Sequence, residues 1–578
     1  MSNARRRLGG TRWVLKEAAS GVADQIAKTS GLPPVVAAAL ANRGVATAEQ
    51  AREFLHGHID DLGDPMTMAG MSEAVALVRG AIDDGRPIRI YGDYDVDGVS
   101  ATALLVRALS ALGGRVDYYL PHRIREGYGL NQAAVERAAA DGIRLLATVD
   151  CGIAAVEAIA QARSAGISVI VVDHHRPPEV LPDADAILNP GRPDCSYPFH
   201  HLAAVGVAYQ LVSALSLTLG IPRQAPYRFL DLVALGTVAD VVPLLGENRI
   251  LLREGLRCLR QTRKVGLQAL IQVSGLAPSR LGSHQIAFVL APRLNAAGRI
   301  EHAEAAARLL LTTDKEEADR LAADLDRHNL QRQEEEGRTL EEAEAMVTES
   351  VDLDRDWVIV LAREGWHVGV VGIVASRLVD RYHRPALLIA LEQGAGRGSG
   401  RSIPDFHLWN ALDAAREHLQ QFGGHAMAAG VTVSEDQVPG LRRALNDHAR
   451  EHLRPEALEP TIVFDAWAQP SELTTEVVSH LNTLAPFGAG NPTPVLASRD
   501  LTLRGVDPLG ANADHARLRL AESARGGSAE AVWFDCADFI NRLTVGQKVD
   551  VCFVPEIDEW RGGSSVRLRV RDLVVGGH

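Results

Sequence analysis

Between residues 88 and 175 the chain alternates short apolar runs with longer amphipathic segments. The apolar runs read PIRIYGD, RVDYYLP, IRLLATVD and ISVIVVDHH, and the segments between them include GVSATALLVRALSAL and GIAAVEAIAQARSAG. Apolar strands separated by amphipathic helices are typical of an α/β domain with a buried parallel sheet. Because ligands bind at the carboxyl ends of such strands, we expect the chemistry of this domain at that edge.

The pattern changes several times after this region. Residues from about 201 to 312 are mostly helical in pattern, and a charged helical stretch follows them. A second α/β pattern begins with WVIVLAR at residue 357, and short β-branched segments dominate the last part of the chain. Those segments predict a small β-barrel of the oligonucleotide-binding (OB) type, although a β-sandwich would give a similar pattern. We therefore expect an N-terminal extension, a parallel-sheet domain, a long connecting helix, a second α/β domain and a barrel, at residues 1–60, 61–312, 313–350, 351–455 and 456–578.

Composition narrows the class of protein. With 578 residues, 46% hydrophobic and 23% charged, the chain is expected to form several globular domains. The formal charge of −13 means that a polyanion would have to bind locally. The five cysteines contain no CxxC pair, which argues against a disulfide framework or a structural zinc site and fits a reducing cytoplasm. No apolar run of about 20 residues occurs, so we expect no export or membrane segment.

Three aspartates, Asp93, Asp95 and Asp97, follow the first apolar run at alternate positions. If strand geometry continued through them, their side chains would point the same way, and their charges would repel unless a cation lay between them. The D-x-D-x-D-G pattern also opens an EF-hand, but Leu104 stands at the twelfth loop position where a glutamate is required. We therefore expect a divalent metal site of another kind.

Other strand ends repeat this feature. Asp150 ends IRLLATVD, the residues Asp173, His174 and His175 end ISVIVVDHH, and Asp240 lies in the apolar segment LVALGTVADVVPL. One aspartate at a strand end is usually a helix cap, but several converging at one sheet edge favour a ligand cluster. Carboxylate and imidazole ligands without cysteine suit Mn²⁺ or Mg²⁺ better than structural zinc. Two such ions would activate water and stabilise displacement at phosphorus, so we expect phosphoester hydrolysis.

These segments resemble those of a known superfamily. GDYDVDG, VDCG, VDHH and TVADVVPL are similar to the first four motifs of the DHH phosphoesterases. The longer arrangement resembles the RecJ family of single-strand-specific exonucleases, in segments that extend over most of residues 60–578. The further segments are LPHRIREGYGLN, APRLNAAGRI, GSGRS, FGGHAMAAG and LAPFGAGNPTPVL.

The resemblance implies roles for individual residues. Asp150 would bridge two divalent cations, Asp173 would orient its neighbours, and His175 would face the scissile phosphate. Some branches of the superfamily have a metal-binding histidine where this chain has Tyr91, which leaves the division of ligands between the ions open. The implied metal ligands are Asp93, Asp95, Asp97, Asp150, His174 and Asp240.

Phosphate binding requires cations and backbone amides beside such an acidic cluster. The glycines of GRGSGRS and FGGHAMAAG would let the backbone approach an anion closely. The resemblance implies that this second α/β domain holds the 5′ phosphate of the substrate. The candidate phosphate-binding residues are Arg123, Arg293, Asn295, Ser399, Arg401 and His425.

Two weaker features suggest further contacts with DNA. One predicted helix carries a basic stripe, which would be either a solvated face or a surface that tracks the DNA backbone. Four aromatic residues would either stack on bases or belong to the core. The stripe consists of Arg253, Arg257, Arg260 and Lys264, and the aromatic residues are Tyr128, Trp366, Phe406 and Trp409.

We therefore predict a metal-dependent 5′–3′ exonuclease that releases 5′-mononucleotides from single-stranded DNA, with the polarity and the role in repair and recombination implied by the resemblance. The alternatives are a phosphodiesterase for short oligonucleotides or cyclic dinucleotides, and a catalytically silent DNA-binding replication scaffold. The expected cofactors are two Mn²⁺ or Mg²⁺ ions. The resemblance also implies contacts with single-strand-binding protein and repair helicases, and we expect a cytoplasmic monomer.

Overall fold

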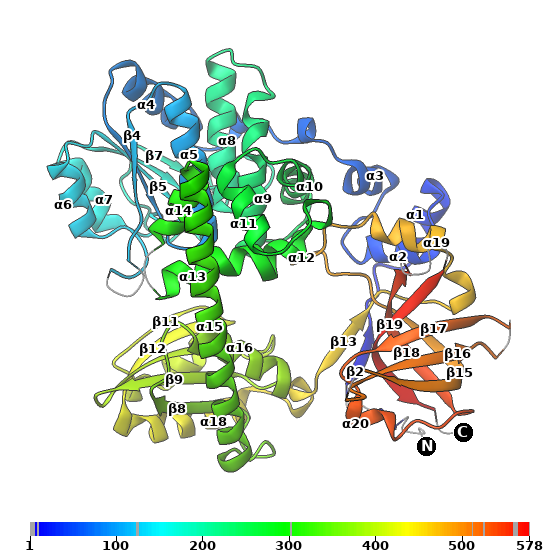
Figure 1. Ribbon diagram of the computed structural model, residues 1–578. Coiled ribbons are helices and arrows are strands. Elements are labelled where there is room, and N and C mark those ends of the chain that lie inside the picture. The colour runs from blue at the N-terminus through cyan, green and yellow to red at the C-terminus, as the bar shows by residue number, and fades with distance from the viewer. Residues whose placement is uncertain are drawn as a thin grey trace. The chain divides into compact units, whose positions relative to one another are not determined.

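The structure is a computed structural model that describes residues 6–7, 11–122, 126–300, 303–510, 512–523, 526–558 and 565–576. The chain divides into two compact units, which are described separately (Figure 1). The first unit comprises residues 49–330 and 484–493, and the second comprises residues 1–48, 331–483 and 494–578.

The first unit is built on a parallel sheet with the strand order β4-β3-β5-β6-β7. Every residue of β3 and β5 is buried, as expected for strands that are apolar along their whole length. The sheet confirms the predicted fold class of this region. Its strands are β3 (Ile88–Gly92), β4 (Val116–Tyr119), β5 (Leu145–Val149), β6 (Ser168–Val172) and β7 (Ala186–Leu188).

Alternate residues of each strand pack on opposite faces of this sheet. Ile90 and Ala147 join a core with α4, α5 and α8, whereas Tyr91, Leu146 and Val171 join a smaller core with α6 and α7. Figure 1 shows α6 and α7 together on one side of the sheet. The helices of this unit include α4 (Met71–Asp83), α5 (Val96–Ala111), α6 (Gln132–Ala140), α7 (Val156–Ser164), α8 (Ala204–Thr218), α9 (Leu230–Ala239), α10 (Gly246–Arg260), α11 (Val265–Val273), α13 (Ala291–Ile300) and α14 (Glu304–Leu311).

The middle of the second unit contains a mixed sheet with the order β11-β12-β10-β9-β8, in which only the β8–β9 pair is parallel among the described strands. Leu387 and Ile389 of β9 pack with α17 and α18, while Leu388 between them packs with α16 on the other face. The elements are β8 (Ile359–Glu364), β9 (Ala386–Glu392), β10 (Ala395–Arg401), β11 (Gln421–Gly424), β12 (Ala428–Ser434), α16 (Val371–Tyr382), α17 (Leu408–Ala414) and α18 (Val438–His452).

The C-terminal part of this unit is a closed barrel, because β15 pairs with β16, β16 with β17, β17 with β19, β19 with β18, and β18 again with β15. Closure removes the exposed strand edges that a sandwich would retain. The expected barrel is thus confirmed. Its strands are β15 (Leu496–Leu509), β16 (His515–Ala521), β17 (Ser528–Trp533), β18 (Lys548–Ile557) and β19 (Val566–Val575).

The long helix α15 (Lys315–Ser350) begins in the first unit and continues into the second. Among the described residues, no helix is both long enough and apolar enough to cross a membrane.

Candidate metal centre

The three aspartates after β3 do not continue the strand, so the geometry predicted for them is wrong. The strand ends at Gly92, and α5 begins at Val96 with Asp95 as its N-cap, whose Oδ1 accepts hydrogen bonds from the amides of Asp97 and Gly98. Asp97 lies in the first turn of α5, and its two carboxylate oxygens accept from the amides of Ala204 and Val205 at the start of α8. Two helix N-termini therefore fix Asp95 and Asp97, which favours their negative charge.

Asp150 follows β5 and is almost completely buried, with 1% of its surface exposed. Its φ of 61° lies in the left-handed region, which is uncommon for a residue other than glycine and marks functional sites. The next residue but one, Gly152, also has a positive φ, and a Cβ there would lie 2.4 Å from Thr148 Oγ1. The chain therefore bends sharply directly after β5.

The residues after β6 form a second part of the site. Asp173 is fully buried and accepts hydrogen bonds from the amides of Ile153, His174 and His175. Its Oδ1 also lies 2.8 Å from His175 Nδ1, which fixes the orientation of that imidazole. His174 has 13% of its side chain exposed and His175 39%, so the two rings have different access to solvent.

Asp240 completes the cluster from the C-cap of α9, and the next residue, Val241, has a positive φ of 62°. His174 Nε2 lies 3.2 Å from Asp150 Oδ1 and 3.5 Å from Asp240 Oδ2. The strand ends and the end of α9 thus bring together residues that are up to 147 positions apart, from Asp93 to Asp240.

The side chains fall into overlapping groups whose potential ligand atoms lie within 4.8 Å of one another. Asp150 and His174 each belong to two groups, so either can link neighbouring ions. This arrangement can hold more than one divalent cation with oxygen and imidazole ligands. The groups among the described residues are Asp93, Asp95 and Asp150; Asp97, His174 and Asp240; and Asp150, His174 and His175.

Burial and mutual repulsion raise the carboxylate pKa values. Burial, together with Asp95 and other carboxylates, raises the pKa of Asp150 well above its ordinary value. Burial followed by the charge of Asp95 raises the pKa of Asp97 to about 7, and burial followed by the charge of Asp97 raises that of Asp240 to about 9. Cations between these carboxylates would remove this repulsion.

The two histidines respond differently. Burial, followed by the neighbouring charge of His175, lowers the pKa of His174 to about 4, so its imidazole is neutral at pH 7 and can donate a lone pair to a metal ion. Burial would lower the pKa of His175 as well, but the hydrogen bond with Asp173 and the charges of Asp173, Asp95 and Asp93 together outweigh it and raise that pKa. For Asp173, burial would raise the pKa, but the hydrogen bond from His175 and the backbone amides lower it.

The residues present fit a metal ion on geometric grounds. Both Asp150 Oδ1 and His174 Nε2 are buried, and neither makes a hydrogen bond to any residue that the structure describes. A buried acceptor of this kind is costly unless an ion or water satisfies it. Two such atoms 3.2 Å apart, with further carboxylates around them, form a site suited to Mn²⁺ or Mg²⁺.

Two tyrosines near the centre have distinct roles. Tyr91 is buried, donates from its hydroxyl to the carbonyl of Gly129 and belongs to the sheet core, so it contributes no group to the cluster. Tyr128 is exposed, its hydroxyl donates to the carbonyl of Asp150, and it also lies 3.2 Å from His175 Nδ1. The sequence predicts Tyr128 only as a stacking residue. Its position in the segment EGYGLN is the only sequence feature that points to its contacts with Asp150 and His175.

Of the phosphate-binding candidates expected in the first unit, Arg123 lies outside the described residues. Arg293 and Asn295 lie on α13, and Arg293 pairs with Asp326 at 2.8 Å and donates to the carbonyl of Val289. A Cβ on Gly298 of the same helix would lie 3.3 Å from the carbonyl oxygen of Tyr94, so α13 adjoins the loop between Asp93 and Asp95. The helix is thus close to the cluster, although Arg293 is already engaged in an ion pair.

The candidates in the second unit gather at one end of its mixed sheet. Arg401 Nη1 donates to Ser399 Oγ on β10, and a Cβ on Gly372 would lie 2.8 Å from Ser399 Oγ and 3.1 Å from Arg401 Nη2. Gly372 is in the first turn of α16, whose N-cap Val370 has no side-chain cap. Exposed His425 lies in the hairpin before β12, which the bond from Ser402 N to Met427 O holds against the end of β10. An arginine, a hydroxyl and the N-terminal end of a helix together suit an anion.

The prediction that one helix carries the four-residue basic stripe is wrong, because α10 ends at Arg260 and Lys264 is the N-cap of α11. Arg253 donates to the carbonyls of Leu55 and Gly57, and Arg260 donates to the carbonyl of Leu281. The other two basic residues form ion pairs instead: Arg257 pairs with Glu254, and Lys264 pairs with Asp231.

The aromatic candidates divide by exposure. Trp366 and Phe406 are buried core residues, whereas Trp409 and Tyr128 remain 37% and 55% exposed. Only the exposed pair can stack on a base without rearrangement of the core.

Three family models match successive parts of the chain. The model of the DHH family, N-terminal domain, matches residues 87–237, the DHHA1 domain matches residues 356–451, and the RecJ OB domain matches residues 464–572.

Relatives resemble the chain over most of its length. It is 40% identical to the single-stranded-DNA-specific exonuclease RecJ of Bacillus subtilis over 566 residues, covering 98% of this chain and 71% of that protein. It is 35% identical to the same-named protein of Escherichia coli, with 94% and 96% covered. The crystal structure of RecJ in complex with Mn²⁺ from Thermus thermophilus matches with a TM-score of 0.84 and 30% identity, covering 98% of this chain and 80% of that one.

Proposed function

The chain belongs to the RecJ family of single-stranded-DNA-specific exonucleases, and from that membership we propose that it removes 5′-mononucleotides from the 5′ end of single-stranded DNA. The substrate class follows the names of the relatives. The polarity and a role in DNA repair and recombination are part of the proposal.

The observation that carries the proposal is the cluster of carboxylates and imidazoles at the carboxyl edge of the first sheet. Within it, Asp150 belongs to two of the ligand groups and is held in a left-handed backbone conformation. We assign Asp150 as the bridging ligand of two divalent cations, and the remaining ligands as Asp93, Asp95, Asp97, His174 and Asp240. When bound, the ions would supply an activated water and stabilise charge on the phosphate oxygens.

The protein's own groups would orient and bind the substrate. Asp173 holds the ring of His175 through the 2.8 Å contact with Nδ1, and Tyr128 contacts the same ring, so His175 is placed to donate to a phosphate oxygen. We assign Ser399 and Arg401, beside the start of α16, as the site for the terminal 5′ phosphate, with His425 next to it. Arg123, Arg293 and Asn295 remain our candidates for contacts with the next phosphates.

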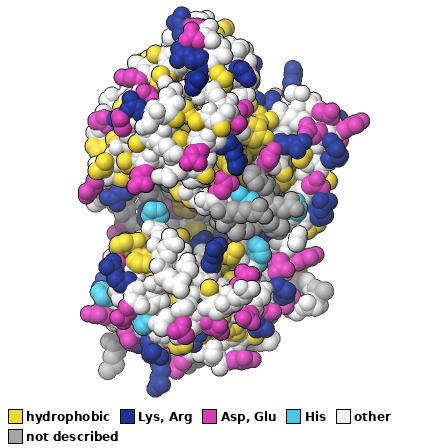
Figure 2. Space-filling model, turned by 90° about the vertical axis from the view of Figure 1, so that its left-hand side faces the viewer, with side chains coloured by type: hydrophobic (Ala, Val, Ile, Leu, Met, Phe, Trp, Pro, Cys, Tyr) yellow, Lys and Arg dark blue, Asp and Glu magenta, His cyan; other side chains and the backbone are white. Residues whose placement is uncertain are grey.

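The electrostatics of the surface support local binding of DNA. The formal charge is −13, and Figure 2 shows basic and acidic side chains interspersed on the face that it presents. Binding must therefore depend on particular residues, since the described side chains on that face form no continuous basic surface.

The alternative functions are less well supported. A catalytically silent scaffold would have no need to keep carboxylates whose pKa values burial raises so strongly, since neutral residues would be more stable there. A phosphodiesterase for very short substrates would not need the closed barrel, whose family model is the RecJ OB domain.

The proposal includes several finer expectations. We place the enzyme in the cytoplasm as a monomer that meets single-strand-binding protein and repair helicases on its DNA substrate. We also keep the proposed domain limits at residues 60, 312, 350 and 455.

A digestion experiment tests the proposed function. Single-stranded DNA labelled at either the 5′ or the 3′ end is incubated with the full chain in Mn²⁺ or in EDTA, with a blunt duplex as the control substrate. We expect the 5′ label to be released first as a mononucleotide, only with the metal and only from the single strand. Early release of the 3′ label, or equal digestion of the duplex, would overturn the proposal.

A further inference from the structure

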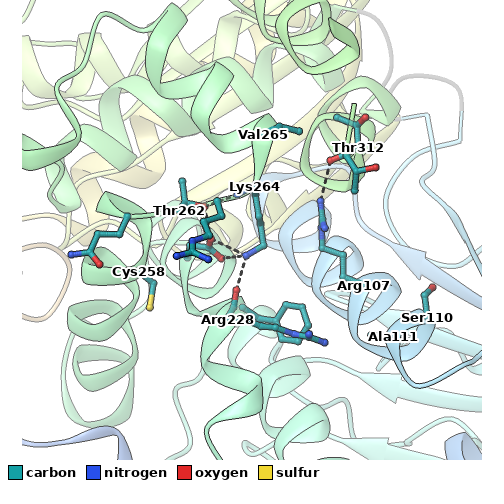
Figure 3. Close-up of a pocket in the computed structure, with 14 residues that line it drawn as sticks. Arg107, Ser110, Ala111, Arg228, Cys258, Thr262, Lys264, Val265 and Thr312 are labelled. Carbon is teal, nitrogen blue, oxygen red and sulfur yellow. Dashed lines mark hydrogen bonds and ion pairs between the residues drawn. The ribbon is translucent and has the colours of Figure 1, made fainter. Parts of the chain in front are cut away.

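The first unit contains a cavity that plays no part in the proposed reaction (Figure 3). Its volume is about 770 Å³, within the range of sites for small ligands. It is bounded by the end of α5, the start of α9, the link between α10 and α11, and the residues after α14. The lining residues used below are Arg107, Arg228, Asp231, Arg263, Lys264 and Thr262.

This cavity lies at the opposite ends of two helices that carry metal-site residues. On α5, Asp97 and Arg107 are ten residues apart, a rise of about 15 Å. On α9, Asp231 is in the first turn and Asp240 is the C-cap, a rise of about 13 Å. The cavity is therefore separate from the metal cluster, although the same helices reach both.

The lining is strongly cationic. Four basic side chains contribute to it, and Asp231 is the one carboxylate among its lining residues. Asp231 is 4% exposed and lies 2.7 Å from Lys264 Nζ, and its Oδ2 also accepts a hydrogen bond from Thr262. The opposite charges of Lys264 and Asp231 cancel, and Figure 3 shows that Lys264 also donates to the carbonyl of Arg228. The three arginines therefore carry the net charge of the cavity.

The three arginines differ in what they already contact. Arg107 donates to the carbonyls of Leu310, Leu311 and Thr312 at the end of α14, which holds its guanidinium at the wall of the cavity. Arg228 and Arg263 are exposed, and neither guanidinium makes a hydrogen bond or an ion pair with any described residue. The guanidinium of Arg228 lies over the ring of Phe229, with 4.8 Å between its central carbon and the ring centroid.

We propose that this cavity binds a nucleoside phosphate, with its phosphate groups between the arginines and its uncharged part against the apolar wall. A planar guanidinium binds phosphate oxygens in pairs, and three arginines balance the charge of about −3 on a diphosphate group. Ala111, Val265 and Cys258 provide the apolar wall, and Thr313 and Gln261 add hydrogen-bonding groups for a ribose or a base.

A DNA strand is the less favoured occupant. A strand needs an open groove that repeats its contacts from one phosphate to the next, whereas the basic residues here converge on one cavity. The basic residues of α10 do not extend the cavity into such a groove, because Arg253 and Arg260 are bonded to backbone carbonyls.

Calorimetric titration of the full chain tests the proposal. The protein is titrated in EDTA, so that nucleotide cannot bind through metal ions, with ADP, adenosine or inorganic phosphate. We expect ADP to bind saturably at one site, phosphate to bind more weakly and adenosine not to bind. Saturable binding of adenosine, or phosphate binding as tightly as ADP, would overturn the proposed ligand class, and absence of ADP binding would overturn the site.

Variants locate the binding. The double change Arg228→Ala and Arg263→Ala removes two exposed side chains, so the fold should be retained, and each lost charged contact should weaken ADP binding about tenfold or more. Arg280→Ala, at an exposed arginine outside the cavity lining, is the matched control and should bind as the wild type does.

Two further variants separate this site from the proposed reaction. Asp150→Asn and Arg401→Ala should leave ADP binding in EDTA unchanged, even where they impair nuclease activity. Binding that is lost in Arg401→Ala but kept in the double variant would assign ADP to the second unit and overturn the proposal. So would displacement of ADP by an unphosphorylated single-stranded 12-mer in the wild type, because the cavity would then belong to the DNA path.

Discussion

Asp150→Asn is the most informative change in the proposed metal centre. The side chain is 1% exposed, belongs to two ligand groups and has its pKa raised first by burial and then by neighbouring carboxylates. Asparagine keeps the shape and tolerates the left-handed conformation that φ of 61° requires. The change therefore removes the charge of Asp150 with little disturbance of the backbone.

The expected effect on stability has an unusual sign. Two unit charges 4.8 Å apart, the upper limit within a ligand group, repel each other by about 3.5 kcal/mol at an effective dielectric constant of about 20. Proton uptake relieves part of this repulsion and any shorter separation increases it, so about 3 kcal/mol gives the size of the effect. In EDTA we therefore expect Asp150→Asn to unfold with the same free energy as the wild type or up to about 3 kcal/mol more.

The expected effect on activity is opposite. Loss of the proposed bridging ligand should lower the Mn²⁺-dependent rate by at least about a thousandfold, or about 4 kcal/mol. Mn²⁺ should also raise the melting temperature of the wild type more than that of the variant, because only the wild type keeps the full ligand set.

Asp231→Asn is the matched control, because Asp231 is a buried aspartate in the same unit whose partner Lys264 is only 14% exposed. Removing that carboxylate leaves a buried ammonium without its partner, at a cost of about 3 kcal/mol with or without Mn²⁺. The measurements are urea unfolding in EDTA and in Mn²⁺, and release of a 5′ label from single-stranded DNA. The reasoning is refuted if Asp150→Asn is destabilised in EDTA as much as Asp231→Asn, or if it cleaves within about tenfold of the wild-type rate.

Three other changes test separate parts of the structure. Gly98→Ala would place a Cβ 2.7 Å from the backbone oxygen of Asp93, so we expect this variant to lose Mn²⁺-dependent stabilisation and cleavage. The control Gly80→Ala, whose Cβ would meet only a side chain at 3.7 Å, should behave as the wild type. Equal behaviour of the two variants would contradict this expectation. Arg401→Ala should raise KM about tenfold or more for 5′-phosphorylated DNA, and an equal rise for 5′-hydroxyl DNA would argue against the assigned phosphate site. Arg89→Met removes a 10% exposed guanidinium that binds two aspartates and should cost about 1–3 kcal/mol in urea unfolding; a change below about 0.5 kcal/mol would count against a stabilising role.

The sequence predicts the sheet and its acidic edge well because both depend on local patterns. The apolar runs at 88–92 and 145–149 are long enough to specify buried strands, and aspartates directly after them must lie at the carboxyl edge. The start of α5 was also available locally, since Asp95 precedes a helical apolar pattern and is a typical N-cap. The expectation that the strand continues through the aspartates conflicts with this N-cap position of Asp95.

Contacts between distant segments could not be predicted in the same way. The carboxylate of Asp97 binds the amides of Ala204 and Val205, more than 100 positions away, and only the packing of α5 against α8 brings them together. For the same reason, helical spacing predicts that Arg253 and Arg260 share a face of α10, but it cannot predict that both donate to carbonyls of other segments. Periodicity predicts which residues share a face, while tertiary packing decides what covers that face.

The electrostatic design of the metal centre follows from where its carboxylates lie on their elements. Asp95 and Asp97 accept amide hydrogen bonds at the N-termini of α5 and α8, where the helix dipoles favour negative charge. Asp240 lies at the C-terminal end of α9, where the dipole opposes it, and burial followed by the charge of Asp97 raises its pKa to about 9. A cation beside Asp240 would therefore relieve both the repulsion from other carboxylates and the unfavourable dipole. Since His174 is neutral and within 3.5 Å of Asp240, a cation between these two residues would meet both a carboxylate and an imidazole.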